Sequence, residues 1–165
     1  MKKKALLIFV FVLMVSTFLA ACNGSGNQFD PKVEQEKATK VMNSVLNSFD
    51  DEEKLAEAKT RDEANQIAWG KIKEKNAKAI SKDLSKDGQK LLLYILTVNK
   101  AEDLPNGETK SNLLFSQGAK IKSVSLNETE KRFTFDMERY EIDHKLITLE
   151  KQEHVWKIVR VEDPE

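Results

Sequence analysis

The chain contains few side chains suited to chemistry, and they are scattered. Its single cysteine, Cys22, could act as a nucleophile or a metal ligand, but no second cysteine exists for a disulfide. The two histidines, His144 and His154, fall near opposite ends of one expected strand, about 33 Å apart if that strand is extended. Because a transition metal needs clustered ligands, we expect no metal site and no cofactor.

Motifs for other common reactions are also missing from the sequence. Neither a Gly-x-Ser-x-Gly elbow nor a glycine-rich phosphate loop occurs. The acidic run Asp50–Glu53 is interpreted as a solvated turn, and Asp83 and Asp87-Gly88 lack the remaining ligands of a calcium loop. We therefore predict no catalytic residue.

Aromatic residues are the main candidates for lining a pocket between helices and a sheet. The five are Trp69, Phe133, Phe135, Tyr140 and Trp156. Aromatic residues at such spacing more often form the core, so core packing is the favoured interpretation. Arg139 and Glu141 lie beside an expected strand irregularity, which could re-aim a side chain.

The first residues combine a basic start, Lys2–Lys4, with an apolar run from Ala5 to about Leu19. A charged start, an apolar run and small residues before a cleavage point are the parts of an export signal. The run has about 15 residues, whereas a membrane-spanning helix needs about 20. We therefore interpret residues 1–21 as a signal peptide.

The stretch Leu19-Ala20-Ala21-Cys22 resembles the lipobox of bacterial lipoproteins. The resemblance implies cleavage between Ala21 and Cys22 and a diacylglyceryl thioether on Cys22, which would occupy the thiol. Two or more acyl chains hold a protein durably on a membrane. The expected location is the extracytoplasmic face of a cell membrane, reached through this lipid anchor. The alternative is an unmodified thiol that follows an uncleaved anchor.

The charge balance excludes some classes of partner. The chain has 27 basic and 27 acidic side chains, and loss of residues 1–21 would remove three lysines and no acid, leaving a net charge of −3. Nucleic-acid binding calls for a basic face, so we expect no nucleic-acid partner. Arginine occurs only four times among the basic residues, which hints at a low-GC Gram-positive source.

The N-terminal half carries helix signals. Asp30-Pro31 suits a helix start, and an apolar stripe at three- and four-residue steps runs to Phe49. The run Asp50–Glu53 either ends this helix or caps a short continuation through Leu55 and Ala58.

Further signals follow downstream. Thr60-Arg61-Asp62-Glu63 matches a capping box and predicts a second helix, with apolar residues continuing to Ile80. The dense apolar run Leu91–Val98 fits a buried helix or a buried strand, and we favour the helix. A turn is expected within Asp103–Lys110, which contains Pro-Asn-Gly.

The last third changes to a strand period. The expected strands are Ile121–Leu126, Arg132–Ile142, Lys145–Lys151 and Val155–Val161. Tyr140 and Ile142 fall on the opposite parity from Phe133, which indicates a bulge near Arg139. The expected turns are Asn127–Glu130, Asp143-His144 and Gln152–His154, and such short connections join antiparallel neighbours.

These elements predict an α+β protein in which N-terminal helices pack on a curved C-terminal antiparallel sheet. Residues 22–29 would be a flexible tether, 30–162 a single domain and 163–165 a tail. The arrangement is similar to cystatin-like and nuclear-transport-factor-two-like folds. The Gln-x-Val-x-Gly hairpin of inhibitory cystatins is replaced here by Ser116–Lys120, so inhibition is not expected.

We expect a tethered, non-catalytic module that binds an envelope protein or another ligand. The alternative is a small enzyme or ligand carrier with a pocket between helices and sheet. A transporter's substrate receptor usually needs two lobes and a longer chain, which disfavours that role.

Overall fold

The computed structural model describes residues 29–165. The predicted signal peptide, Cys22 and the predicted tether up to residue 28 lie outside the described residues. Pro31–Glu165 form one compact unit.

The described residues form helices and antiparallel strands, and the α+β prediction is confirmed. The elements in chain order are α2 (Pro31–Leu46), β1 (Lys54–Ala58), α3 (Arg61–Lys75), α4 (Lys86–Leu96), β2 (Thr97–Asp103), β3 (Thr109–Phe115), β4 (Ala119–Asn127), β5 (Arg132–Arg139), β6 (Asp143–Gln152) and β7 (Val155–Glu162).

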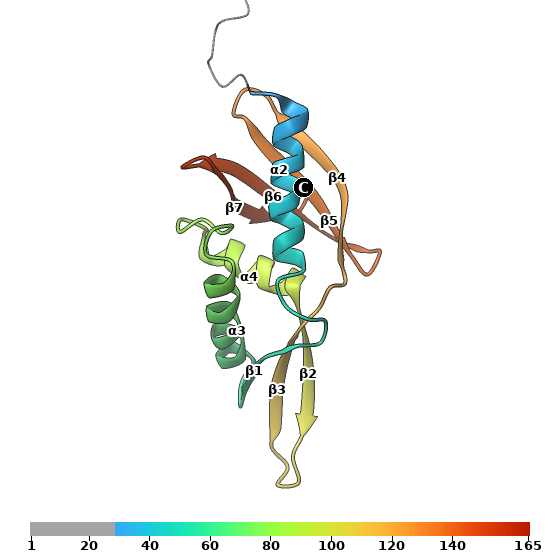
Figure 1. The fold of residues 1–165 in the computed structure, drawn as a ribbon. Coiled ribbons are helices and arrows are strands. Elements are labelled where there is room, and N and C mark those ends of the chain that lie inside the picture. The colour runs from blue at the N-terminus through green and yellow to red at the C-terminus, as the bar shows by residue number, and fades with distance from the viewer. Residues whose placement is uncertain (1–28) are drawn as a thin grey trace, which may run out of the picture. The chain divides into compact units, whose positions relative to one another are not determined.

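The strands form two sheets rather than the single expected one. The C-terminal sheet has the order β4-β5-β6-β7, and a smaller sheet has the order β1-β3-β2. Helices α2 and α4 pack against β7 of the larger sheet, and α3 packs against β1 and β3 of the smaller one. The β2–β3 hairpin projects away from the larger sheet (Figure 1).

The first helix begins at Pro31 as predicted, and its apolar stripe is buried. Of the two alternatives for Asp50–Glu53, the helical continuation through Leu55 and Ala58 is wrong, because the helix ends at Leu46 and Lys54–Ala58 forms β1, which pairs with β3. Glu52 has a positive φ of 62°, which breaks the helical path. The backbone N–H of Glu52 donates to Phe115 O at 2.9 Å, which aligns the segment with β3.

The predicted cap of the second helix is confirmed, since Thr60 Oγ1 accepts the Glu63 N–H at 3.2 Å. The helix ends at Lys75, before the apolar residues Ala79 and Ile80. Ile80 instead forms an isolated bridge with Ile158 of β7.

Replacing Thr60 with alanine is expected to lower the free energy of unfolding by about 1 kcal/mol, because the Glu63 N–H loses its acceptor. Urea denaturation measures the change. Ser44, exposed in the last turn of α2, provides a matched control, because alanine there favours the helix slightly. Equal losses in the two variants would contradict the capping role of Thr60.

The apolar run Leu91–Val98 divides between the two alternatives. Helix α4 ends at Leu96 and strand β2 starts at Thr97, so the favoured helix holds for most of the run only. The Thr97 hydroxyl donates to Leu93 O at 2.7 Å at this junction. The predicted turn in Asp103–Lys110 is confirmed at residues 104–108.

The predicted strand Arg132–Ile142 ends three residues early, at Arg139. Tyr140 and Glu141 have positive φ values of 55° and 65°, so the change of parity marks a hairpin turn and not a bulge. The β5–β6 register is continuous up to the pair Arg139 and Asp143. The turn predicted at Asp143-His144 is therefore wrong, since both residues belong to β6.

The inward face of β5 holds Phe133, Phe135, Met137 and Arg139. The Phe133 and Trp156 rings lie 5.1 Å apart, which links β5 to β7 over the intervening strand β6. The three apolar residues confirm the predicted alternation. The fourth inward residue, Arg139, is charged, and it lies at the centre of the candidate site.

Candidate functional site

The residues predicted to carry the lipid anchor, Ala21 and Cys22, lie outside the described residues. The structure therefore leaves the predicted cleavage and thioether as predictions. No helix within residues 29–165 is long and apolar enough to span a membrane.

The two histidines lie at different places in the fold. His144 is on β6, where its Nδ1 lies 2.9 Å from Asp136 Oδ1 and its Nε2 lies 3.8 Å from Glu138 Oε2. His154 is exposed in the β6–β7 turn, at a φ of 68°. Within residues 29–165, no group of three His, Cys, Asp or Glu side chains is arranged to hold a metal ion.

The acidic runs have exposed side chains. Asp50–Glu53 is an exposed turn before β1, as predicted, and Glu52 pairs with Lys100 at 3.0 Å. Asp83 lies in the loop before α4, and Asp87-Gly88 belongs to the first turn of that helix.

The five candidate aromatic residues do not line a common pocket. Phe133, Phe135 and Trp156 are buried in the core. Trp69 lines a cleft between α3 and α4, and Tyr140 is 60% exposed on the β5–β6 turn. The favoured core interpretation holds for three of the five.

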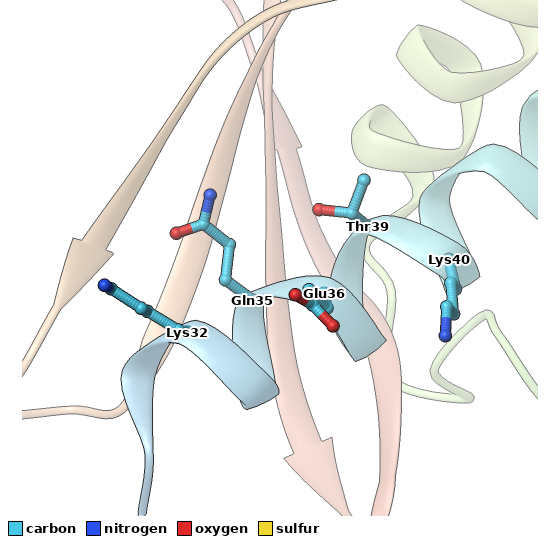
Figure 2. Close-up of a pocket in the computed structure, with 5 residues that line it drawn as sticks. All are labelled: Lys32, Gln35, Glu36, Thr39 and Lys40. Carbon is cyan, nitrogen blue, oxygen red and sulfur yellow. The ribbon is translucent and has the colours of Figure 1, made fainter.

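A hollow of about 460 Å³ lies along the outer side of α2. Its lining residues are Lys32, Gln35, Glu36, Thr39 and Lys40 (Figure 2). All five come from one helix, and they combine two lysines with one carboxylate. The described residues that line this hollow include no buried polar group, so its α2 side resembles an ordinary solvated helix surface.

A larger cleft, of about 770 Å³, brings distant segments together, and we call it the Arg139 cleft. Its lining includes polar and aromatic residues from α3, α4 and the end of β5: Arg61, Asp62, Lys90, Tyr94, Arg139 and Tyr140. Strands β2 and β3 complete the lining with Val98 and Leu113 among other residues. The cleft thus lies between helices and both sheets.

Arg139 is 5% exposed, and its guanidinium is held by neutral oxygens. Nη1 donates to the backbone oxygen of Tyr94, and Nη2 donates to Thr97 O at 2.7 Å and to the Tyr140 hydroxyl at 3.2 Å. The buried Nε has no hydrogen-bond partner. Among residues 29–165, no carboxylate forms an ion pair with this guanidinium. The guanidinium is still not an isolated charge, because Asp143 is its cross-strand neighbour on β6 and its attraction to Arg139 helps to lower the pKa of Asp143.

Two tyrosine rings flank the guanidinium. Its Cζ lies 4.7 Å from the Tyr140 ring centroid and 5.3 Å from that of Tyr94. Both contacts are in the range of cation–π attraction. Both tyrosines are partly exposed, and the Tyr94 ring also lies 5.3 Å from Lys145 Nζ.

An ion-pair network positions Tyr94. Its hydroxyl donates to Asp143, which also accepts from Lys145 Nζ at 2.5 Å, and Lys145 pairs with Asp163 at 3.0 Å. The Lys145 hydrogen bond, and then that of Tyr94, lower the pKa of Asp143. Its hydrogen bond to Asp143 raises the pKa of Tyr94. Burial lowers the pKa of Lys145, but its hydrogen bonds to Asp143 and Asp163 raise it overall.

These shifts keep the network in one charge state at neutral pH: Tyr94 stays protonated, Asp143 ionised and Lys145 charged. A general acid or base works best with a pKa near the operating pH, so these groups are better suited to positioning than to proton transfer. The arrangement can bind an anion next to Arg139.

Sequence reasoning identified Arg139 only through a bulge that does not exist. A better signal was available, because Arg139 continues the inward parity of Phe133, Phe135 and Met137, and charged residues are rarely buried. Glu141, the other candidate near the expected bulge, is exposed in the turn. Tyr94, Arg61 and Lys90 were missed, since no local pattern connects them to Arg139.

Comparison with known proteins gives no relative. No family model matches the chain, and neither a curated protein nor a solved structure matches it. The function of the chain is therefore inferred from the chemistry of its own residues.

Proposed function

We propose that this protein is a lipoprotein anchored through Cys22 to the extracytoplasmic face of a cell membrane, and that its domain binds a ligand or envelope partner without catalysing a reaction. The anchor is supported by Leu19-Ala20-Ala21-Cys22 after a basic and apolar start. The folded unit begins at Pro31, so eight residues separate it from the proposed lipid. A domain on such a short link would work close to the bilayer.

The binding role is carried by one observation, the buried guanidinium of Arg139 beside a cleft, with an Nε–H that has no hydrogen-bond acceptor. Buried polar groups without a hydrogen-bond partner are costly, and where they persist they commonly serve a function. Phe133, Phe135 and Trp156 fill the interior between α2 and the larger sheet. The Arg139 cleft is therefore the place where we propose that the partner binds.

The position of this cleft also favours the ligand-carrier alternative over an enzyme. It lies between helices and sheets, where a carrier would hold its ligand, and Tyr94 and Leu113 give it apolar surface. The ionisable groups behind it, Asp143 and Lys145, are already paired with each other. A small-molecule carrier is therefore the second candidate function, and it would use the same cleft.

The anchor is tested by expressing the full chain in a Gram-positive host fed an alkyne-tagged fatty acid. We expect the label on Cys22, an N-terminus beginning at Cys22, and recovery in the membrane fraction. Cys22→Ala should lose the label and the cleavage, whereas the neighbouring substitution Asn23→Ala should retain both. Mass spectrometry that finds a free Cys22 thiol, or residues 1–21 still attached, would overturn the anchor.

A further inference from the structure

We propose that the Arg139 cleft is a carboxylate-binding site that recognises a single carboxylate attached to an apolar body. This inference rests on the proposed binding function and specifies its ligand. The same chemistry has two sources, a small organic acid and an acidic side chain of a peptide. The experiment below distinguishes them.

The guanidinium of Arg139 has an N–H group that no acceptor satisfies. Its η nitrogens donate to the backbone oxygens of Tyr94 and Thr97 and to the Tyr140 hydroxyl. None of these acceptors carries a charge, and the Nε–H has no acceptor at all. A guanidinium forms its strongest hydrogen bonds with planar anions. Asp143 interacts with Arg139 electrostatically, but no hydrogen bond joins the two side chains within the described residues. A bound carboxylate would therefore supply the acceptor that Nε lacks.

A ligand could reach the guanidinium of Arg139 from the side that Tyr140 covers. Nε is fully buried, so a ligand must displace something to reach it. The Tyr140 ring covers Arg139, yet it is 60% exposed and stands on a turn with positive φ at Tyr140 and Glu141. Positive φ also occurs at Glu153 and His154 in the β6–β7 turn, so it is ordinary for these hairpins, and the exposure of Tyr140 is what leaves its ring room to move. We assign Tyr140 as a lid that swings away when the carboxylate enters.

Positively charged side chains outnumber negatively charged ones in the lining of the Arg139 cleft. The lining contains three cations, Arg61, Lys90 and Arg139, against one carboxylate, Asp62. Lys90 pairs with Asp87 at 3.4 Å, and both side chains are mostly exposed, so this pair is weak. The excess of positive charge would attract an anion toward Arg139.

The acidic residues and the apolar surface of the cleft favour a monoanion with an apolar body. Asp62 and Glu63 already occupy the first turn of α3, where they satisfy the helix dipole and would repel a phosphate dianion. The remaining lining includes Leu91, Leu93 and Val98, which offer apolar contact next to the guanidinium. Inorganic phosphate could not use that apolar surface, whereas an arylalkyl carboxylate could.

The test follows the Arg139 Nε–H resonance by ¹H–¹⁵N NMR, using the full chain purified from membranes in detergent. Phenylacetate is the probe, and its neutral analogue phenylacetamide is the matched control. We expect phenylacetate to shift the resonance saturably and phenylacetamide to leave it unchanged. The peptide N-acetyl-Phe-Glu-amide forms the second arm. Tighter binding of this peptide than of phenylacetate would assign the site to an acidic side chain, and the reverse would assign it to a free acid.

Variants provide the second readout. Arg61→Gln with Lys90→Gln should weaken phenylacetate binding about two- to fivefold, since each exposed charge contributes modestly. Lys78→Gln with Lys82→Gln removes two exposed lysines outside the lining and should have no effect. Tyr140→Phe should bind at least as tightly, because the ligand no longer competes with the Tyr140 hydroxyl. These variants leave Arg139 in place, so misfolding of an Arg139 variant does not compromise the test.

Three results would overturn the proposal: no shift with either carboxylate, an equal shift with phenylacetamide, or a shift with inorganic phosphate alone. None of them touches the lipid anchor, which the Cys22 labelling experiment tests separately. Conversely, a free Cys22 thiol would remove the proposed location and leave the titration of the cleft valid.

Discussion

Replacing Phe133 with alanine is expected to lower the free energy of unfolding by about 3–5 kcal/mol. The Phe133 side chain is fully buried on the central strand β5 and packs on the Trp156 ring at 5.1 Å. Its removal leaves a cavity that neighbouring backbone cannot fill, because β5 is hydrogen-bonded on both sides. For a domain of ordinary stability, this loss is a large share of the total free energy of unfolding. Urea unfolding followed by circular dichroism measures the change.

The matched control for this prediction is Ile142→Ala. Ile142 is also apolar but 87% exposed, and it lies on the turn that follows the same strand. Its replacement should change stability by less than about 0.5 kcal/mol. Phe133→Leu should fall between the two, since it retains most of the buried volume. Comparable losses for Phe133→Ala and Ile142→Ala would show that the core does not lie where we place it.

The second large effect concerns the buried carboxylate of Glu34, which joins α2 to the larger sheet. Its oxygens accept from Lys37 Nζ at 2.8 Å, from Lys151 Nζ at 2.9 Å and from Trp156 Nε1 at 2.9 Å. The Lys37 hydrogen bond, aided by those of Lys151 and Trp156 and opposed by burial, lowers the pKa of Glu34 from 4.5 to about 2.

The direction of the pH effect follows from this shift. A carboxylate whose pKa is lower in the folded state contributes stability above its unfolded pKa, and the contribution disappears as pH falls through the folded pKa. The domain should therefore lose up to about 3 kcal/mol through Glu34 between pH 4.5 and pH 2. Glu34→Gln should lose a similar amount at pH 7, and its deficit should shrink toward zero at pH 2. Urea unfolding at several pH values measures both.

Glu57 provides the control for this prediction. Its pKa is also lowered to about 2, first by the Lys110 hydrogen bond and then by that of Lys54, but its side chain is 38% exposed. Exposed pairs are screened by salt, whereas buried ones are screened much less. At 1 M NaCl the effect of Glu57→Gln should vanish and that of Glu34→Gln should persist. A pH profile of Glu34→Gln that parallels the native profile would contradict the role of Glu34.

Several elements could be predicted because their signals are local. The start at Asp30-Pro31, the cap at Thr60 and the alternation through Phe133 depend on residues within a few positions of each other, and all are confirmed. The similarity to cystatin-like folds depends on topology instead, and it stays a prediction, because no solved structure matches.

The errors in the strand region share one cause. The local pattern left a helix end and a helical continuation open for the β1 segment and did not predict a strand, because the partner strand β3 begins about fifty residues later, at Thr109. The turn at Tyr140 was interpreted as a bulge because a change of parity accompanies either one. In both cases the deciding fact was which backbone lay alongside, and that partner is not part of the local pattern.

The sequence alone determined the helix cap at Thr60, the strand alternation and the motif that predicts an anchored Cys22, since each depends on residues within a short window. Only the tertiary structure decided the candidate site. Arg61 from α3, Tyr94 from α4 and Arg139 from β5 meet in one cleft although they are far apart in the chain. Burial of a charge depends on everything packed around it, so the state of Arg139 emerges only when the core and both sheets have formed.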